Sequence, residues 1–338
     1  MALMQNLSLR VLPGLLIAGL LLAAAFAAGV VWYHAPSGKL INGTLALAWF
    51  AFALACIAVY LRRNDWRALA ALAAPFAAIL MWFILIEPSN DRVWSPEMAR
   101  LLTYMREGDA LTVKNVRNFN WTGPKTADER WETRRYSLTQ LKSVDVLSLY
   151  WKGPRIAHTY FSFVWQDGEA LSLSVEIRKE TDESYSPVAG FFKAYELSIL
   201  AGDERDFYGW RIHFPKEDIQ LFRTRANSGE AGKLLIALLD AANERAVKPV
   251  FYNTLTENCT TEVWMLTDAM GLGAPFDWRL FASGYLPEFL YDLKLLDGSR
   301  RIEDLRAAGH VMPRVRAALD RDLTGAAFSN AIREGVAN

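Results

Sequence analysis

The chain has 338 residues, a formal net charge of zero and two cysteines. Its length fits one globular domain plus a membrane anchor. The balanced charge gives no reason to expect a nucleic-acid partner, because nucleic-acid-binding proteins carry a basic patch. Charge is also unevenly distributed. Positions 11–86 hold only a few charged residues, whereas the composition after Glu87 is that of an ordinary globular protein.

Three apolar runs stand near the N-terminus, each close to the about 20 residues that a helix needs to cross a bilayer. We predict a three-helix transmembrane anchor over residues 1–86, with its spans at Val11–Trp32, about Gly43–Leu61 and about Leu69–Ile86. The alternative for the first run is a cleaved signal peptide. The run is long for a signal core, and two more spans follow it.

The basic residues of the short loops predict the orientation of this anchor. The segment Arg62–Arg67 (RRNDWR) carries three arginines between the second and third spans. If this loop is cytoplasmic, the N-terminus is also cytoplasmic and everything after Ile86 lies outside. We therefore expect a multi-pass protein of the bacterial inner membrane with a periplasmic C-terminal domain.

The rest of the chain predicts an α+β domain. Residues 87–109 are expected to form a linker (Glu87–Glu97) and a juxtamembrane helix (Pro96–Glu107), and residues 110–338 the periplasmic domain. Alternating apolar residues predict strands at Ala110–Phe119, Val144–Trp151, Ala157–Trp165, Ala170–Ile177, Tyr208–Phe214 and Ile219–Thr224. Helical periodicity predicts helices at Gly229–Ala246 and Thr261–Met270.

Two of these strands form a predicted hairpin around Asp167-Gly168, since this dipeptide between alternating runs is a turn signal. Matching the apolar faces of both strands favours a three-residue loop over residues 167–169. A slip of one residue in the pairing would place the apolar side chains of one strand on the polar face of the hairpin. In that register His158 lies opposite Arg178 and diagonal to Glu176, within reach of long side chains.

Cys259 is the candidate nucleophile. Cys56 lies in an apolar run far from it, so the predicted topology gives no disulfide and leaves Cys259 a lone thiol in an oxidising compartment. Asn258 is a natural N-cap, which places Cys259 in the first turn of a helix. Free backbone N–H groups and the helix dipole favour a thiolate there, and the thiolate is the nucleophilic form. The alternative is a buried structural cysteine.

His158 is the best candidate base of the domain, with Glu176 placed to orient its ring. His213 stands between apolar strand residues, and His310 lies in a polar C-terminal region. The alternatives are a His158 that is hydrogen-bonded to the backbone and a Glu176 that pairs with Arg178 or another basic residue. The third polar member of the site can also be Ser162, Ser174, Asn253 or Asn258. No metal-ligand spacing is present, so no metal or cofactor is expected.

These residues lie in stretches that resemble the Lnb N-terminal periplasmic domain family, long catalogued as a domain of unknown function. The resemblance spans about Trp94–Gly335, and the stretches that carry it are Asn115–Phe119 (NVRNF), Ala157–Phe163 (AHTYFSF), Leu171–Glu180 (LSLSVEIRKE), Gly202–Asp206 (GDERD), Tyr252–Thr261 (YNTLTENCTT), Ser283–Asp292 (SGYLPEFLYD) and Phe328–Gly335 (FSNAIREG). It implies a circularly permuted papain-like, NlpC-related fold with an antiparallel sheet and a cysteine-bearing helix, in which the histidine strand precedes that helix. It also implies fatty-acyl transfer to a lipoprotein amine, with Cys259 as nucleophile, His158 as base and Glu176 as orienting group.

Three hypotheses follow for the function. The first is an acyltransferase or hydrolase that forms a Cys259 thioester on a lipid or lipoprotein. The second is a cysteine peptidase or amidase acting on cell-wall peptides, and the third is a non-catalytic membrane-anchored binding module. A polar groove favours peptides, whereas an apolar tunnel favours acyl chains. A substrate-binding or supporting role is assigned to five neighbours of the site, Asn258, Asn253, Tyr252, Arg178 and Tyr160.

Overall fold

The structure is a computed structural model that describes residues 2–151, 153–214, 216–261, 264 and 275–336. The chain divides into two compact units. Unit 1 consists of Met1–Pro88 together with Ser186–Ala194, and unit 2 of Ser89–Tyr185 and Tyr195–Asn338. The segment Ser186–Ala194 therefore belongs to the N-terminal unit, although it lies within the sequence of the C-terminal one.

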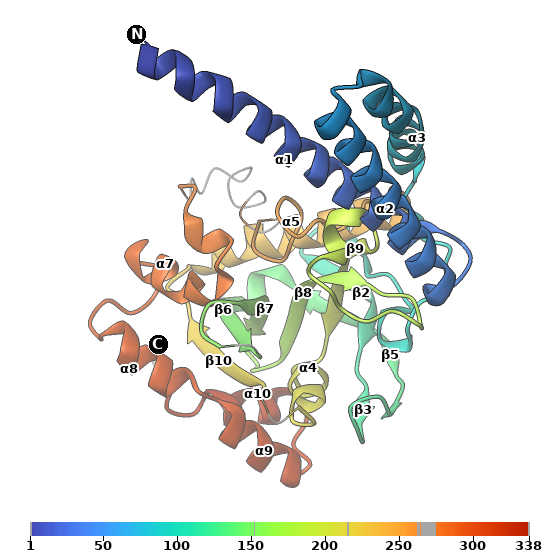
Figure 1. Ribbon diagram of the computed structural model, residues 1–338. Coiled ribbons are helices and arrows are strands. Elements are labelled where there is room, and N and C mark those ends of the chain that lie inside the picture. The colour runs from blue at the N-terminus through green and yellow to red at the C-terminus, as the bar shows by residue number, and fades with distance from the viewer. Residues whose placement is uncertain (1, 152, 215, 262–263, 265–274, 337–338) are drawn as a thin grey trace. The chain divides into compact units, whose positions relative to one another are not determined.

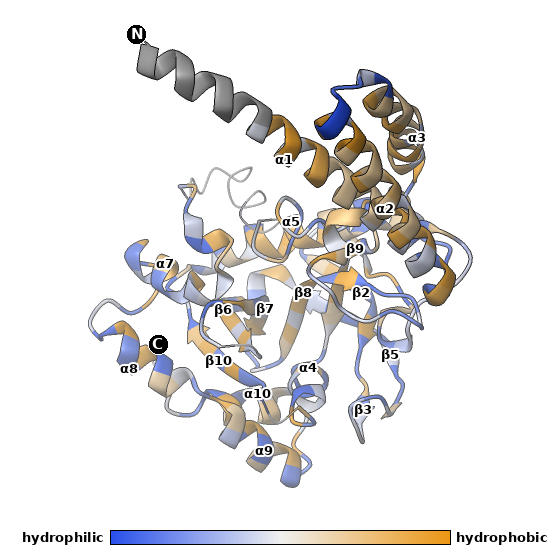
Figure 2. Cartoon of the chain, in the orientation of Figure 1, coloured by the Kyte–Doolittle hydropathy of each residue, from blue (hydrophilic) through white to orange (hydrophobic). Residues whose placement is uncertain are grey.

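Unit 1 is built on three long helices, α1 (Ala2–His34), α2 (Lys39–Arg63) and α3 (Trp66–Leu85) (Figure 1). Apolar residues cover α2, α3 and the coloured part of α1, and a hydrophilic turn joins α2 to α3 (Figure 2). Their apolar windows are only 6% to 28% buried within the protein. Helices that are apolar on all sides and largely uncovered by protein are suited to lipid. The three predicted membrane spans are thus confirmed in length and composition.

The predicted cytoplasmic loop is a tight turn. Asn64 ends α2 in the left-handed conformation (φ 49°), and its N–H donates to the carbonyl of Tyr60. The Asp65 side chain accepts from the N–H of Arg67 at 3.0 Å and caps the start of α3. Asparagine tolerates this backbone region and aspartate is a preferred N-cap, so these two residues suffice to reverse the chain.

Unit 2 is an α+β domain around one mixed, eight-stranded sheet. The strand order is β1-β2-β9-β8-β7-β6-β10, with β5 paired to β2. The strands are β1 (Thr103–Glu107), β2 (Ala110–Arg117), β5 (Trp131–Ser137), β6 (Leu141–Tyr150), β7 (Ala157–Trp165), β8 (Ala170–Arg178), β9 (Glu196–Gly202) and β10 (Asp218–Arg223), and a separate two-stranded ribbon is formed by β3 (Asn120–Trp121) and β4 (Ala127–Asp128).

Helices cover both faces of the central strands. Helix α5 (Ser228–Val247), closed at its start by a capping box of Asn227 and Glu230, packs on β6 and β9. On the opposite face Tyr160 of β7 joins a core with residues of α4 (Glu204–Arg211), α9 (Met312–Asp320) and α10 (Gly325–Arg333). Because both faces are covered, β6, β7 and β8 are buried along most of their length, and the buried residues include Ser148, Ser162, Ser172 and Ser174.

Short helices and turns complete the unit. They are η1 (Pro96–Met98), η2 (Leu138–Gln140), η4 (Trp278–Leu280), η5 (Ser283–Tyr285), α7 (Leu286–Asp292) and α8 (Ile302–Gly309).

The predicted β7–β8 hairpin is present, but its register differs by two residues. Pairs run from Tyr160 opposite Ser174 to Val164 opposite Ala170. The N–H of Trp165 donates to the carbonyl of Glu169, so the three-residue loop covers positions 166–168 and not 167–169. Gly168 adopts φ +89°, the left-handed position that closes such a loop. A shift of two keeps every side chain on its predicted face, and it places Glu176, not Arg178, across from His158.

Two predicted elements were wrong in type. The predicted helix Pro96–Glu107 is only η1 followed by the strand β1, which turns at Gly108-Asp109 and pairs with β2. The predicted strand Tyr208–Phe214 is instead largely helix α4 and the turn after it, and Asp203 caps the start of that helix by accepting from the N–H of Arg205. Of the predicted linker Glu87–Glu97, the part from Ser89 onward belongs to unit 2, and the Ser89 N–H donates to the Glu196 carboxylate at 3.0 Å.

Candidate active site

His158, near the start of β7, forms a hydrogen-bonded cluster with two side chains of β8. Its Nε2 atom lies 2.7 Å from Ser174 Oγ and 2.9 Å from Glu176 Oε1. Ser174 Oγ in turn donates to Glu176 Oε1 at 2.8 Å. The antiparallel register produces this cluster, because Ser174 and Glu176 lie two residues apart on one face of β8.

The cluster favours an imidazolium–carboxylate pair. Burial lowers the pKa of His158, but the charge of Glu176 and hydrogen bonds to Cys259 and Glu176 outweigh it and raise this pKa to about 10. Burial raises the pKa of Glu176, but the charge and hydrogen bond of His158 dominate and lower it to about 2. The two side chains are only 15% and 17% exposed, so water screens their attraction weakly. At neutral pH both are charged.

Cys259 is half-buried, and its thiol is a hydrogen-bonding partner of the His158 ring. A thiol beside an imidazolium is the setting in which proteins hold a reactive thiolate. The structure therefore brings the three residues predicted as nucleophile, base and orienting group into one contiguous cluster.

Asn258 has the hydrogen bonds of an N-cap. Its side-chain oxygen accepts from the N–H groups of Thr260 at 2.9 Å and Thr261 at 3.0 Å. Thr261 and Trp264 are helical. Most of the helix predicted over Thr261–Met270 lies outside the described residues. Cys259 lies in the turn directly after the cap, and within the described part of the chain its backbone N–H donates to no other group.

A cavity of about 280 Å³ opens beside Cys259. Its described walls are mostly apolar and come from β6 and β7, helix α5, the region of η4 and α7, the residues that follow β10, and the segment that holds Cys259. Representative lining residues are Val144, Val146, Phe161, Leu234 and Phe289. Its volume is near the lower end of the ~300–1,000 Å³ usual for ligand sites. A mostly apolar space with a thiol in its wall suits an apolar group.

Comparison with known families agrees with the geometry. Residues 127–284, which contain the whole cluster, match the sequence model of the Lnb N-terminal periplasmic domain. The resemblance to the Lnb N-terminal periplasmic domain family is thus confirmed over residues 127–284. The match is shorter than the resemblance read from the sequence, which extended to about Trp94 and Gly335. No curated protein and no solved structure matches the chain.

Two predicted supporting residues of the Lnb domain shape the loop before Cys259. Asn253 and Glu257 exchange backbone hydrogen bonds at 3.1 Å, and the Asn253 side chain accepts from the N–H of Leu255 inside that turn. The Tyr252 ring is 8% exposed and pairs with Tyr185 by a side-chain hydrogen bond. Burial, followed by the nearby charge of Cys259, raises the Tyr252 pKa. Tyr252 therefore lies beside the thiol, whereas Asn253 holds the turn.

Arg178 and Tyr160 have structural surroundings. Arg178 is 2% exposed, donates to the carbonyls of Met98 and Ala99, and stacks 4.1 Å from the Trp94 ring centroid. It holds the segment before β1 and does not contact Glu176, so the alternative Glu176–Arg178 pair is wrong. Tyr160 is 1% exposed, and its ring centroid lies 6.0 Å from that of His158.

The other candidates lie apart from the cluster. Ser162 bonds to Glu204 and Arg333 in a buried charged network, so it is not the third member. His213 Nε2 bonds to the Trp121 carbonyl, and His310 pairs with Asp218. Among the described residues no group of three or more His, Cys, Asp or Glu side chains is arranged to hold a metal ion.

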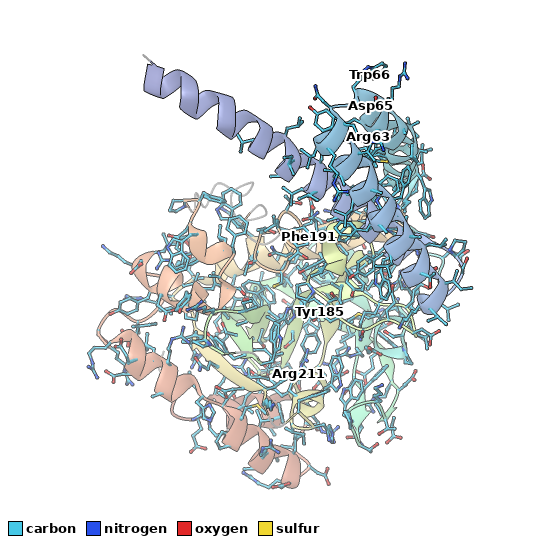
Figure 3. The ribbon with its side chains drawn as sticks, viewed as in Figure 1. Arg63, Asp65, Trp66, Tyr185, Phe191 and Arg211 are labelled. Carbon is cyan, nitrogen blue, oxygen red and sulfur yellow. The ribbon has the colours of Figure 1, made fainter. Side chains whose placement is uncertain are left out.

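Two residues near the Lnb-domain site were not predicted. Tyr185, in the loop after β8, reaches Tyr252, and burial followed by the charge of Cys259 raises its pKa. Arg211, at the end of α4, lines a water-sized space with His158 and Glu176 and adds to the lowering of the Glu176 pKa. Figure 3 labels both residues. Neither residue belongs to a sequence motif. Only their closeness to the cluster in the folded chain identifies them.

Proposed function

We propose that the protein is a membrane-anchored periplasmic thiol acyltransferase or hydrolase that forms a Cys259 thioester on a lipid or lipoprotein substrate. The observation that carries the proposal is the meeting of two features at one sulfur atom. Cys259 is the hydrogen-bonding partner of the His158–Glu176 pair, and it also lines the apolar cavity.

The chemistry uses the charged His158–Glu176 pair beside the thiol. The Cys259 thiolate attacks the carbonyl carbon of an ester, and the electron pair moves to the carbonyl oxygen. The unused N–H of Cys259 is a donor for that oxyanion. As the intermediate collapses, the leaving alkoxide takes a proton from His158, and an acyl thioester remains on Cys259. An amine or water then attacks the thioester, His158 takes its proton, and the thiolate is released.

The cavity favours an acyl chain over a cell-wall peptide. A peptide substrate needs hydrogen-bond partners along its backbone, because unpaired polar groups are costly to bury. The described walls of the cavity are dominated by aliphatic and aromatic side chains, with a few threonines and Glu230. An alkyl chain needs no hydrogen-bond partners, and each methylene group that it buries contributes about 0.8 kcal/mol to the free energy of binding. The membrane anchor also fits a substrate that resides in the membrane.

The fold expected for this function is a permuted papain-like, NlpC-related one, in which His158 and Glu176 on the sheet precede Cys259 at a helix start. The expected topology has the N-terminus and Arg62–Arg67 in the cytoplasm of a bacterial cell. Support for this topology comes from the odd number of candidate spans before a periplasmic domain and from the arginine-rich turn.

The experiment is to trap the acyl-enzyme. The full-length protein in membranes is incubated with a phospholipid whose acyl chains are radiolabelled, and the purified chain is tested for label that neutral hydroxylamine releases, as it does from thioesters. We expect label on the wild type and on Cys56→Ser, which removes the other thiol. We expect none on Cys259→Ser, and a rate about 10²–10⁴-fold lower on His158→Ala.

The proposal fails if the folded wild-type protein carries no more hydroxylamine-sensitive label than Cys259→Ser. Folding is checked by the melting temperature, and access to the thiol by alkylation of Cys259 with iodoacetamide. A protein that is folded and alkylated but never acylated would be a binding module, or an enzyme for another substrate class.

A further inference from the structure

The segment Ser186–Ala194 joins β8 to β9 in unit 2, yet it packs with the transmembrane helices as part of unit 1. It contains the short helix η3 (Ala189–Phe192). A simple surface loop of a periplasmic domain would pack on that domain or extend into water. What this segment contacts within unit 1 therefore bears on its role.

Phe192 packs against one side of α1. Its ring stacks on Phe26 at 5.5 Å between centroids and on Tyr33 at 5.3 Å. Gly29 lies between these two residues, and a Cβ atom there would come within 2.3 Å of the Phe192 ring. The absence of a side chain at Gly29 thus makes the space that the ring occupies.

The backbone and the next side chain are also held by the helices. Lys193 Nζ donates to the carbonyls of Phe83 at 2.9 Å and Ile86 at 3.1 Å, at the C-terminal end of α3. The Phe192 carbonyl bonds to His34 Nε2. Non-helical backbone at membrane depth is tolerated only where protein groups satisfy it, and His34 satisfies the Phe192 carbonyl in this way.

The position of Phe192 along α1 indicates how deep its ring lies in the membrane. Helix α1 ends at His34 and rises about 1.5 Å per residue, so Gly29 lies ~8 Å and Phe26 ~12 Å before the helix end. Both residues are inside the apolar window Gly14–His34. The ring of Phe192 therefore lies alongside the part of α1 that lipid surrounds.

Two apolar side chains of the same segment remain uncovered by the protein. Val188 is 57% and Phe191 is 41% exposed. Within unit 1, Phe191 lies toward the opposite end of the helices from Arg63, Asp65 and Trp66 (Figure 3). That is the end where α1 and α3 finish and where Lys193 and His34 make their bonds.

We propose that Ser186–Ala194 is a membrane-inserted loop, a fourth membrane-embedded element supplied by the periplasmic domain, in which Val188 and Phe191 contact lipid acyl chains. The occupant of this apolar surface is the bilayer, because the surface continues the lipid-facing surface of the spans. The inference does not depend on the proposed enzymatic activity. The loop follows β8, the strand that carries Ser174 and Glu176. The three helices therefore pack against the segment that leads out of this strand.

The test is lipid quenching of a fluorophore in the full-length chain. Cys56→Ser and Cys259→Ser remove the native thiols. Val188→Cys, Phe191→Cys or Ser299→Cys then provides one site for a thiol-reactive bimane, with Ser299 as an exposed, polar position of unit 2. The labelled proteins are reconstituted in phosphatidylcholine vesicles with or without lipids that carry a nitroxide on the acyl chain.

We expect about threefold or greater quenching at positions 188 and 191 relative to position 299, because an inserted apolar surface lies ~5–10 Å below the headgroup boundary. Phe192→Ala should reduce the quenching at position 188, since the loop loses its contact with α1. Equal, low quenching at all three positions in folded protein would overturn the proposal. Since the readout needs no catalysis, it remains informative if no acyl-enzyme is found.

Discussion

Replacing Glu176 by glutamine removes the negative charge that faces His158 and keeps the size of the side chain. At 1.36 kcal/mol per pKa unit, the rise of the His158 pKa from 6.5 to about 10 corresponds to ~5 kcal/mol of stabilisation. The fall of the Glu176 pKa from 4.5 to about 2 corresponds to ~3 kcal/mol on the same scale. Both describe the same attraction, so they are not added. We use the lower figure, because Cys259 also raises the His158 pKa and remains in the variant.

The pH dependence of this loss has a definite direction. A histidine whose pKa is raised by folding contributes its full stabilisation below pH 6.5 and loses it as the pH rises through about 10. A glutamate whose pKa is lowered contributes fully above pH 4.5 and loses its contribution as the pH falls through about 2. The pair is therefore at full strength between about pH 4.5 and 6.5. At pH 9 only about 1 kcal/mol remains from His158.

The assay is the melting temperature of the full-length protein in detergent, followed by tryptophan fluorescence. A loss of ~3 kcal/mol lowers the melting temperature of a domain of this size by about 6–12 °C at pH 6, and the difference should shrink to about 2–4 °C at pH 9. Glu303→Gln, at an exposed carboxylate of α8, is the control and should change little at either pH. A Glu176→Gln difference that is the same at pH 6 and pH 9 would refute the assigned ion pair.

Three further outcomes follow from the structure. Leu234→Trp fills the cavity from α5. It should reduce acylation by long-chain lipids at least about tenfold, while iodoacetamide still alkylates Cys259. Acylation equal to that of the wild type would mean that the acyl chain does not bind in this cavity. Gly168→Ala places a Cβ on a residue with φ +89°, 3.0 Å from Asn330 Nδ2. This should lower the free energy of unfolding by about 2 kcal/mol and the melting temperature by about 4–8 °C. An unchanged melting temperature would argue against the turn at positions 166–168. Asn258→Ala removes a helix cap that contributes about 1 kcal/mol to stability, and it should slow alkylation of Cys259. Asn258→Asp keeps a hydrogen-bond acceptor and should retain the stability and the alkylation rate of the wild type. An Asp variant as impaired as the Ala variant would contradict the capping role.

The elements predicted correctly are those whose pattern is local. The spans were evident because a bilayer requires long apolar runs, and β7 because aromatic and β-branched residues alternate over its length. The errors have local explanations too. The Gly108-Asp109 turn signal between β1 and β2 was overlooked, and in α4 an aromatic-rich segment was taken for a strand although Asp203 precedes it as an N-cap.

The sequence by itself determined the lone thiol after an N-cap, the histidine and carboxylate on one face of a hairpin, and the membrane anchor. These follow from residue type, period and spacing. Only the tertiary structure decided the contact between Cys259 and His158, the Glu176 partner, the cavity, and the packing of Phe192 on α1. Each of these depends on segments far apart in the chain, whose meeting is set by the packing of the whole sheet and not by any local pattern.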